Sequence, residues 1–169
     1  MDREHSLARL RAVVTDVLAT EIGPEDMDKG LEQLGINSII FIKLVVQLEK
    51  ELAAFVGKEE ALCFATGFTV NSGVIPCLTG RGDYIICDDR DHASIVDGKR
   101  LSFSQNLKYK HNDMADLEKQ LQKCNPDAIK LIIVDGVFSM EGDLANLPEI
   151  VRLKHKYNAS IMVDEAHGL

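Results

Sequence analysis

The stretch Ala159-Ser-Ile-Met-Val-Asp-Glu-Ala-His-Gly-Leu169 decides the fold class, because it joins an apolar run directly to acidic and histidine side chains. Residues 161–163 predict a buried strand, and Asp164 follows at its carboxyl end. A carboxylate in this position lies where open α/β sheets bind ligands. His167 comes three residues later and can reach the same ligand. We therefore expect a ligand site at the end of this strand.

The sequence before this stretch alternates between strand-like and helix-like segments from about residue 60. The predicted strands are 61–64, 84–87, 131–134 and 161–163, and the predicted helices are 67–78, 92–101, 114–123 and 147–157. Strands that alternate with crossover helices are typical of a doubly wound, mostly parallel sheet. The predicted fold class is therefore α/β with a partial sheet of this kind, preceded by a short helical segment.

Two helices are expected in the N-terminal part. Apolar residues at helical spacing predict an amphipathic helix over residues 3–20. Asn37 or Ser38 can cap the next helix by accepting a hydrogen bond from an unpaired backbone N–H. No Gly or Pro occurs between Ser38 and Val56, and Gly57 is a natural C-cap. We expect one uninterrupted helix from about Ile39 to Phe55.

Composition limits the function classes. The chain has 169 residues, 46% of them hydrophobic, which suits one domain or a small domain with part of another. A net charge of −8 argues against a nucleic-acid-binding surface. The charged N-terminus leads into no signal-peptide core, and no apolar run reaches membrane-spanning length, so a cytoplasmic protein is predicted. The cysteines show no metal-ligand spacing and are expected to be small buried hydrophobic residues: Cys63, Cys77, Cys87 and Cys124.

Residues 1–48 carry a motif of their own. The stretch Leu34-Gly-Ile-Asn-Ser38-Ile-Ile-Phe-Ile-Lys43 resembles the start of the second helix of the acyl carrier protein family. That resemblance implies a 4′-phosphopantetheine arm on Ser38, in an incomplete carrier-like helical segment. A helix N-terminus would favour the added phosphate. The alternative is that Ser38 is an ordinary N-cap residue.

Residues 49–169 resemble the α-oxoamine synthase family of fold-type I pyridoxal-phosphate enzymes, as the front half of the large domain. The resemblance rests on several motifs in one order: Leu48-Glu-Lys-Glu-Leu, Ala65-Thr-Gly-Phe-Thr-Val-Asn71, Asp91-His-Ala-Ser94, Asp135-Gly-Val-Phe-Ser-Met-Glu-Gly-Asp143 and Val163-Asp-Glu-Ala-His-Gly168. It implies a pyridoxal 5′-phosphate-dependent C-acyltransferase that condenses an amino acid with an acyl thioester of coenzyme A or of a carrier. It also implies a homodimer in the complete enzyme.

The resemblance assigns roles to named residues. Asp164 would pair with the ring nitrogen of the cofactor, and His92 would stack on the ring. The helix that opens at Gly67 and Phe68 would hold the phosphate with free N–H groups. Taken alone, His92 could equally be a solvated loop histidine, and Gly67 a simple strand-to-helix turn.

Two further side chains are assigned to the phenolic oxygen of the cofactor. Ser139 lies in a Gly-flanked loop after a predicted strand, and His167 follows Asp164. Ser139 read by itself would be a common turn serine. The lysine that forms the Schiff base in this family is expected beyond the Asp-x-Ala-His-Gly motif, so no lysine here is assigned to it. We expect the chain to be part of a longer enzyme and to be inactive by itself.

Other readings stay open. Asp164-Glu-Ala-His167 also matches the Mg-binding box of a helicase family, but the required phosphate loop is absent from the sequence. A metal site built from Asp135, Asp164 and His167 has no supporting ligand spacing, so no metal is predicted. The chain could also be a non-catalytic carrier or interaction module with Ser38 as its chemical site, or a translated fragment without a stable fold.

Overall fold

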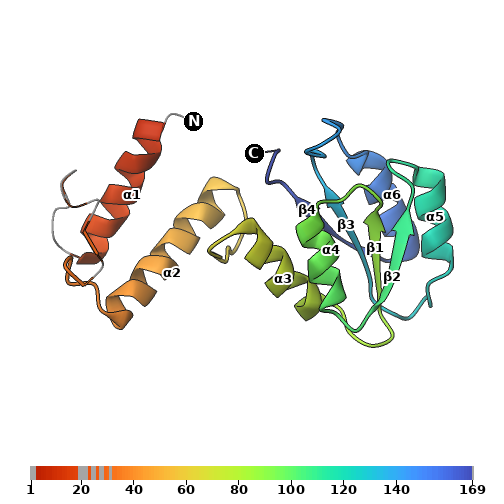
Figure 1. Ribbon diagram of the computed structural model, residues 1–169, viewed down its shortest axis with the longest axis horizontal. Coiled ribbons are helices and arrows are strands. Elements are labelled where there is room, and N and C mark those ends of the chain that lie inside the picture. The colour runs from red at the N-terminus through yellow and green to blue at the C-terminus, as the bar shows by residue number, and fades with distance from the viewer. Residues whose placement is uncertain (1–2, 19–22, 24–25, 27–28, 31, 169) are drawn as a thin grey trace. The chain divides into compact units, whose positions relative to one another are not determined.

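The computed structural model describes the chain except residues 1–2, 19–22, 24–25, 27–28, 31 and 169 (Figure 1). The chain divides into two compact units, residues 1–63 and 64–169.

The first unit is built from two helices, α1 (Arg3–Leu18) and α2 (Ser38–Phe55). The prediction of a first helix is confirmed, although its expected last two residues lie outside the described part of the chain. Helix α2 is uninterrupted, as predicted. Asn37 caps it, because its Oδ1 accepts hydrogen bonds from the N–H groups of Ile39 and Ile40, both at 3.0 Å.

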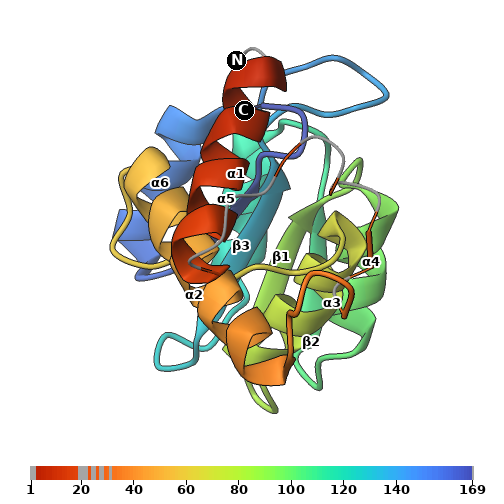
Figure 2. The same cartoon turned by 90° about the vertical axis from the view of Figure 1, so that its left-hand side faces the viewer.

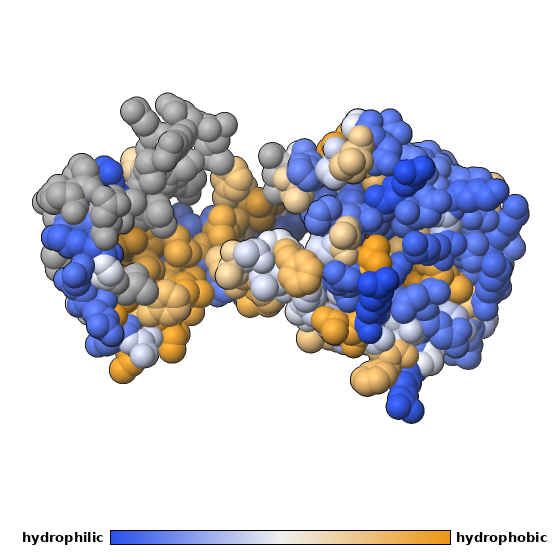
Figure 3. All heavy atoms as spheres, viewed as in Figure 1, coloured by the Kyte–Doolittle hydropathy of each residue, from blue (hydrophilic) through white to orange (hydrophobic). Residues whose placement is uncertain are grey.

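Helix α2 exposes an unusual number of apolar side chains. Leu44 and Ala53 are buried, but Ile39 is 68% exposed. Figure 3 shows hydrophobic residues gathered over α2, whereas hydrophilic residues cover most of the second unit in the same view. The other large apolar residues exposed along α2 are Phe41, Ile42, Val46, Leu52 and Phe55.

The second unit contains a four-stranded sheet in the order β2-β1-β3-β4. The strands are β1 (Tyr84–Asp88), β2 (Gln105–Tyr109), β3 (Lys130–Asp135) and β4 (Ser160–Asp164). Every pairing between them is parallel. This arrangement confirms the predicted α/β class with a parallel sheet.

Helices cover both faces of this sheet (Figures 1 and 2). On one face, α3 (Gly67–Leu78) and α4 (Ala93–Arg100) pack their Ile75 and Ile95 against β1 and β3. On the other face lie α5 (Met114–Gln122) and α6 (Leu147–Tyr157). Strand β3 is buried along its whole length, as expected for a central strand between two helical layers.

Two details of the predicted strands are wrong. Residues 61–64 form no strand; Leu62 is exposed, and the N–H of Cys63 donates to the Glu49 carboxylate at 2.8 Å. An apolar run without a neighbouring strand has no ladder to join. Strand β2 was not predicted, because Gln105-Asn-Leu-Lys-Tyr109 is mostly polar and lies at the sheet edge.

The cysteine prediction is only half right. Cys87 and Cys124 are buried, but Cys63 and Cys77 are exposed. Burial raises the pKa of the Cys87 thiol to about 12, so this side chain behaves as an apolar core residue. Among the described residues, no helix has both the length and the apolar character needed to cross a bilayer.

Helices α3 and α4 approach each other closely at Gly98. A Cβ atom placed there would lie 2.5 Å from the backbone oxygen of Asn71 and 2.9 Å from Cδ1 of Ile75. Only glycine therefore allows this contact without moving a helix. The contact fixes the position of α3 relative to the start of α4.

We predict that Gly98→Ala lowers the free energy of unfolding by about 1–3 kcal/mol, because the added methyl group forces α3 and α4 apart. Urea denaturation followed by circular dichroism measures the change. Gly80→Ala is the matched control, since its Cβ would meet only Asp83 Oδ2 at 3.9 Å. An unchanged midpoint for Gly98→Ala would show that the helices are not held at this distance.

Candidate functional site

Carboxylates gather at the carboxyl edge of the sheet. Strands β1, β3 and β4 end in Asp88, Asp135 and Asp164, and Asp135 is the register partner of Asp164. Because the strands are parallel, their carboxyl ends meet at one edge, where such sheets bind ligands. The sequence prediction of a carboxylate at the end of the last strand is confirmed in position.

Asp164 is half-buried and is held by neutral donors. Its Oδ2 accepts a hydrogen bond from Asn71 Nδ2 at 2.9 Å, and its Oδ1 accepts one from the Ala166 N–H at 3.0 Å. Among the described residues, no lysine or arginine forms an ion pair with it. A half-buried carboxylate that receives hydrogen bonds from neutral groups suits a cationic group of a ligand.

His92 is the N-cap residue of α4. Its Nδ1 lies 3.2 Å from the Ser94 N and 2.7 Å from the Ser94 Oγ. Its backbone N–H donates to Asp135 Oδ2 at 2.7 Å. The ring is exposed, while the backbone is tied to the end of β3. The backbone of His92 is thus held by a strand-end carboxylate, while the role of its ring stays a prediction.

Asn71 connects these groups and had no role assigned from the sequence. It is 2% exposed on α3, and its Nδ2 donates both to Asp164 and to Ser94 Oγ, the latter at 2.8 Å. The signal that could have identified it is a single amide among the apolar residues that α3 turns to the sheet. A buried amide of this kind needs partners.

Asp91 is a second buried carboxylate beside His92. Its Oδ1 accepts from the Asp135 N–H at 3.2 Å, while its Oδ2 has no hydrogen-bond partner among the described residues. Burial raises the pKa of Asp91 to about 8. The hydrogen bond from the Asp135 N–H lowers this pKa, whereas the negative charges of Asp135 and Asp88 raise it further. Asp91 therefore favours its protonated form near neutral pH.

The pKa of Asp135 is also raised. Burial is the main cause, and the neighbouring Asp164 carboxylate adds to it, although the hydrogen bond from the His92 N–H acts in the opposite direction. Positive charge on His92 or His167 would also lower the pKa of Asp135. The strand ends thus form one electrostatically coupled group of carboxylates.

Helix α3 begins one turn before Asn71, the residue whose side-chain amide contacts Asp164. Thr66 caps it in a reciprocal capping box with Thr69. In the described structure, the N–H groups of Gly67 and Phe68 have no protein acceptor, and the space where a Cβ would stand at Gly67 is open. Unpaired N–H groups at a helix start fit an anionic ligand such as a phosphate.

Ser139 and His167 are both exposed, and no described hydrogen bond joins either one to Asp164. The structure therefore links Asp164, His92 and the start of α3 through Asn71, and leaves these two side chains on adjoining loops. Ser38 lies in the first unit as the exposed first residue of α2, and Asn37 is the residue that caps this helix.

The loop that carries Ser139 is fastened by His111. Its Nδ1 lies 3.0 Å from the buried Asp88 Oδ1, and its Nε2 lies 3.2 Å from Asp143 Oδ2. The ring also packs edge-on against Phe138, with centroids 4.5 Å apart. Although partial burial opposes protonation, the hydrogen bonds to both carboxylates raise the pKa of His111. This histidine ties β1 to the loop between β3 and α6.

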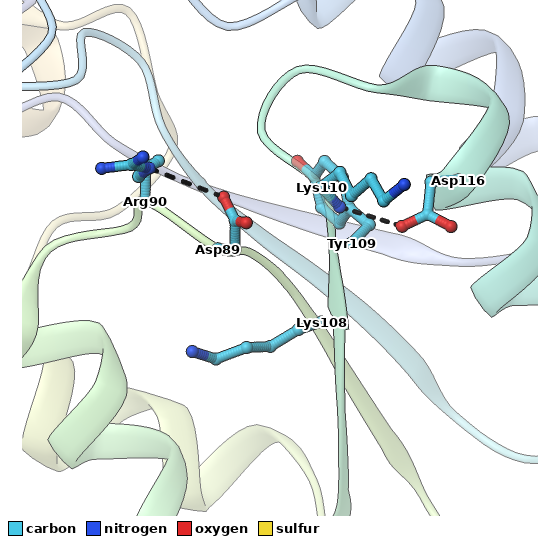
Figure 4. Close-up of a pocket in the computed structure, with 6 residues that line it drawn as sticks. All are labelled: Asp89, Arg90, Lys108, Tyr109, Lys110 and Asp116. Carbon is cyan, nitrogen blue, oxygen red and sulfur yellow. Dashed lines mark hydrogen bonds and ion pairs between the residues drawn. The ribbon is translucent and has the colours of Figure 1, made fainter.

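A surface pocket lies at the carboxyl ends of β1 and of the outermost strand β2, on the side of the sheet away from β4 (Figure 4). Arg90 and Asp89 approach within 4.0 Å there, and the Lys110 N–H donates to Asp116 at 2.9 Å. The pocket contains none of the predicted site residues. It is lined by Asp89, Arg90, Lys108, Tyr109, Lys110 and Asp116.

We predict that Asp91→Asn stabilises the fold at alkaline pH. Because the folded-state pKa is about 8, above the usual aspartate value of 3.8, the stability that protonated Asp91 contributes is lost as the pH rises between these values. Asn keeps the acceptor for the Asp135 N–H without the charge. The difference in unfolding free energy between Asp91→Asn and the wild type should grow by about 1 kcal/mol or more from acid to alkaline pH. A constant difference across this range, in urea titrations, would contradict the assignment.

Comparisons with known proteins agree with this geometry. A model of the family "Aminotransferase class I and II" matches residues 14–169 and thus includes Ser38. A serine palmitoyltransferase of Bacteroides thetaiotaomicron is 90% identical over 128 residues, which cover 76% of this chain and 32% of that protein. An 8-amino-7-oxononanoate synthase of Geobacter sulfurreducens is 51% identical over 127 residues, 75% of this chain and 32% of that protein. The chain spans about a third of the length of these relatives.

Solved structures show the same relationship. A serine palmitoyltransferase of Sphingomonas wittichii superposes with a TM-score of 0.70 and 45% identity, covering 72% of this chain and 30% of that one. A serine palmitoyltransferase of S. paucimobilis with a bound PLP–myriocin aldimine gives a TM-score of 0.73 and 32% identity, covering 95% of this chain and 39% of that one. The predicted resemblance is confirmed: the chain belongs to the aminotransferase class I and II family, and its named relatives are α-oxoamine synthases.

Proposed function

We propose that the chain supplies the cofactor-binding part of a pyridoxal 5′-phosphate-dependent C-acyltransferase of the α-oxoamine synthase type. The observation that carries this proposal is the Asp164 carboxylate, which ends β4 and, within the described part of the chain, accepts hydrogen bonds only from neutral donors. Such a carboxylate suits a protonated ring nitrogen, because the cofactor would then provide the positive charge that pairs with Asp164. The unpaired N–H groups at the start of α3 suit its phosphate.

Each residue would act on a different part of the cofactor. Asp164 would hold the proton on the ring nitrogen, and in that state the ring acts as an electron sink for a carbanion on the amino acid. Gly67 and Phe68 would bind the phosphate through their N–H groups. His92 would cover one face of the ring, since its backbone is fixed by Asp135 and its ring is exposed.

Ser139 and His167 are proposed to bind the phenolic oxygen. Both lie on loops that follow strand ends, Ser139 after β3 and His167 after β4. The Ser139 loop is fastened through Asp143 to His111, which limits its movement. A hydroxyl and an imidazole are both suitable donors to a phenolate oxygen.

Serine and a palmitoyl thioester are the proposed substrates. Their support is the name of the relatives at 90% identity, which are serine palmitoyltransferases of two Bacteroides species. We further propose a cytoplasmic location, as the sequence indicates.

A homodimer is proposed for the complete enzyme. Exposed apolar residues along α2 support it, because extensive apolar surface marks regions that a partner covers. Sedimentation of the complete enzyme as a monomer would contradict this proposal. The carrier function of residues 1–48 stays a prediction that gains no support from the comparisons, since the family match runs through Ser38.

We predict that this chain binds pyridoxamine 5′-phosphate and that Asp164→Ala weakens binding at least about tenfold, because the ring nitrogen loses its counter-charge. Pyridoxamine phosphate is the better probe, since it cannot form adducts with surface lysines. Equilibrium dialysis measures the affinity. Asp127→Ala, an exposed carboxylate in the loop before β3, is the control and should bind normally. Equal affinity of wild type and Asp164→Ala would reject the proposed role.

In a complete enzyme that carries these residues, we predict that Asp164→Ala lowers kcat/KM at least about 10²-fold. His92→Ala should lower kcat/KM less, because stacking of His92 on the ring contributes less free energy than the charge compensation that Asp164 provides. Steady-state assays with serine and palmitoyl-coenzyme A give both values. Near-normal turnover of Asp164→Ala would show that the β4 carboxylate does not serve the reaction.

A further inference from the structure

We propose that Asn71 is a positioning residue that orients the Asp164 carboxylate and fixes the tautomer of His92 through one continuous chain of hydrogen bonds. This inference rests on the proposed function for the identity of the ligand, but the hydrogen-bond chain itself follows from contacts in the second unit. The chain runs Asp164–Asn71–Ser94–His92 and joins β4, α3 and the start of α4.

The orientation of the Asn71 amide follows from its neighbour. An ionised Asp164 can only accept hydrogen bonds, so the atom 2.9 Å from its Oδ2 is the amide nitrogen. That nitrogen carries two hydrogens, and the second one points to Ser94 Oγ at 2.8 Å. Both donors are therefore used, and they bridge two elements that lie 93 and 23 residues away in sequence from Asn71.

The direction of the next hydrogen bonds follows in turn. Ser94 Oγ accepts from Asn71, which leaves its own hydrogen for His92 Nδ1 at 2.7 Å. The Ser94 N–H donates to the same nitrogen at 3.2 Å. Two donors converge on Nδ1, so this atom is the acceptor, and the proton of the neutral ring is on Nε2. The N–H and the hydroxyl of Ser94 thus set the tautomer of His92, and the Asn71 amide on another helix sets the direction of that hydroxyl.

The position of Asn71 is itself held from two sides. Its side chain is buried, and its backbone oxygen stands against Gly98, where even a methyl group would collide. A displaced Asn71 would release Asp164 and Ser94 together. A binding site must hold its side chains within about half an ångström of their working positions. One buried amide here orients two of them, the Asp164 carboxylate and the Ser94 hydroxyl.

The first test is the protonation pattern of His92, observed by long-range ¹H–¹⁵N NMR on the histidine-labelled chain without cofactor, at a pH where the ring is neutral. The wild type should show an unprotonated Nδ1 and a protonated Nε2. Asn71→Leu, which keeps the volume but removes both donors, should raise the fraction of the Nδ1-protonated tautomer. In that variant the Ser94 hydroxyl no longer accepts from Asn71 and is free to accept a proton from Nδ1. Ser94→Ala should raise this fraction less, because the Ser94 N–H still donates to Nδ1 and alanine offers no acceptor for an Nδ1 proton.

The second test is the affinity for pyridoxamine 5′-phosphate. Asn71→Leu should weaken binding roughly tenfold, because the Asp164 carboxylate loses a hydrogen-bond donor and its orientation. Ser94→Ala should have a smaller effect, since the contact between Asn71 and Asp164 is kept. Ser72→Ala is the matched control: it lies next to Asn71 on α3, and its buried hydroxyl has no partner among the described residues. It should change neither the tautomer nor the affinity.

The outcomes separate this inference from the proposed function. A wild type that carries its His92 proton on Nδ1 would overturn the hydrogen-bond chain, whatever the cofactor result. A folded Asn71→Leu with wild-type tautomer and affinity, beside an Asp164→Ala that binds weakly, would overturn the role of Asn71 alone. If the wild type binds no pyridoxamine phosphate, the proposed function fails, and the NMR result still decides the inference. The amide–proton spectrum of each variant shows whether it is folded.

Discussion

Three parallel strands that end in aspartate impose the main constraint on the second unit. Carboxylates at one edge repel each other and lose solvent, so each needs its own donors. Asp88 is enclosed by backbone N–H groups and His111, whereas Asp135 accepts from the backbone of His92. Asp164 relies on Asn71 and one backbone N–H. The loops and helix starts at this edge are arranged around these needs.

The three carboxylates are consequently in different electrostatic states. Asp88 is buried beside a histidine whose pKa is raised, so its charge is met within the protein. In the part of the chain that the structure describes, Asp135 and Asp164 both accept hydrogen bonds from neutral donors alone, and Asp164 is the more exposed of the two. At the same end of the sheet, one strand-end carboxylate is therefore compensated by the protein, and another is left to interact with a ligand. This difference is why Asp164, and not Asp88, is proposed as the cofactor contact.

The sequence predicted the fold where local patterns are strong. Apolar runs that end in aspartate located β1, β3 and β4, and the lack of Gly or Pro predicted the continuous α2. Strand β2 was missed because an edge strand has little to bury. The apolar run at residues 61–64 predicts a strand that the structure does not contain, because such a run does not reveal whether a partner strand lies beside it.

The site divides in the same way. The positions of Asp164 and His92 at strand ends could be predicted, because Asp164 ends an apolar run and His92 comes four residues after the end of another. The role of Asn71 could not, since it depends on contacts 23 and 93 residues away that only the packed helices create. The role of Gly98 could not be predicted either, because it depends on the close approach of α3 and α4 in the folded structure. Local patterns thus identify the residues at strand ends, while tertiary contacts identify what holds them.

The central claim is that the Asp164 carboxylate provides the counter-charge for a cofactor ring. The most direct test is the ¹⁵N NMR shift of the ring nitrogen in labelled pyridoxamine 5′-phosphate bound to this chain in mildly alkaline buffer. The account predicts a protonated nitrogen in the wild type and loss of that proton in Asp164→Ala. An unprotonated ring nitrogen in the wild-type complex would contradict it.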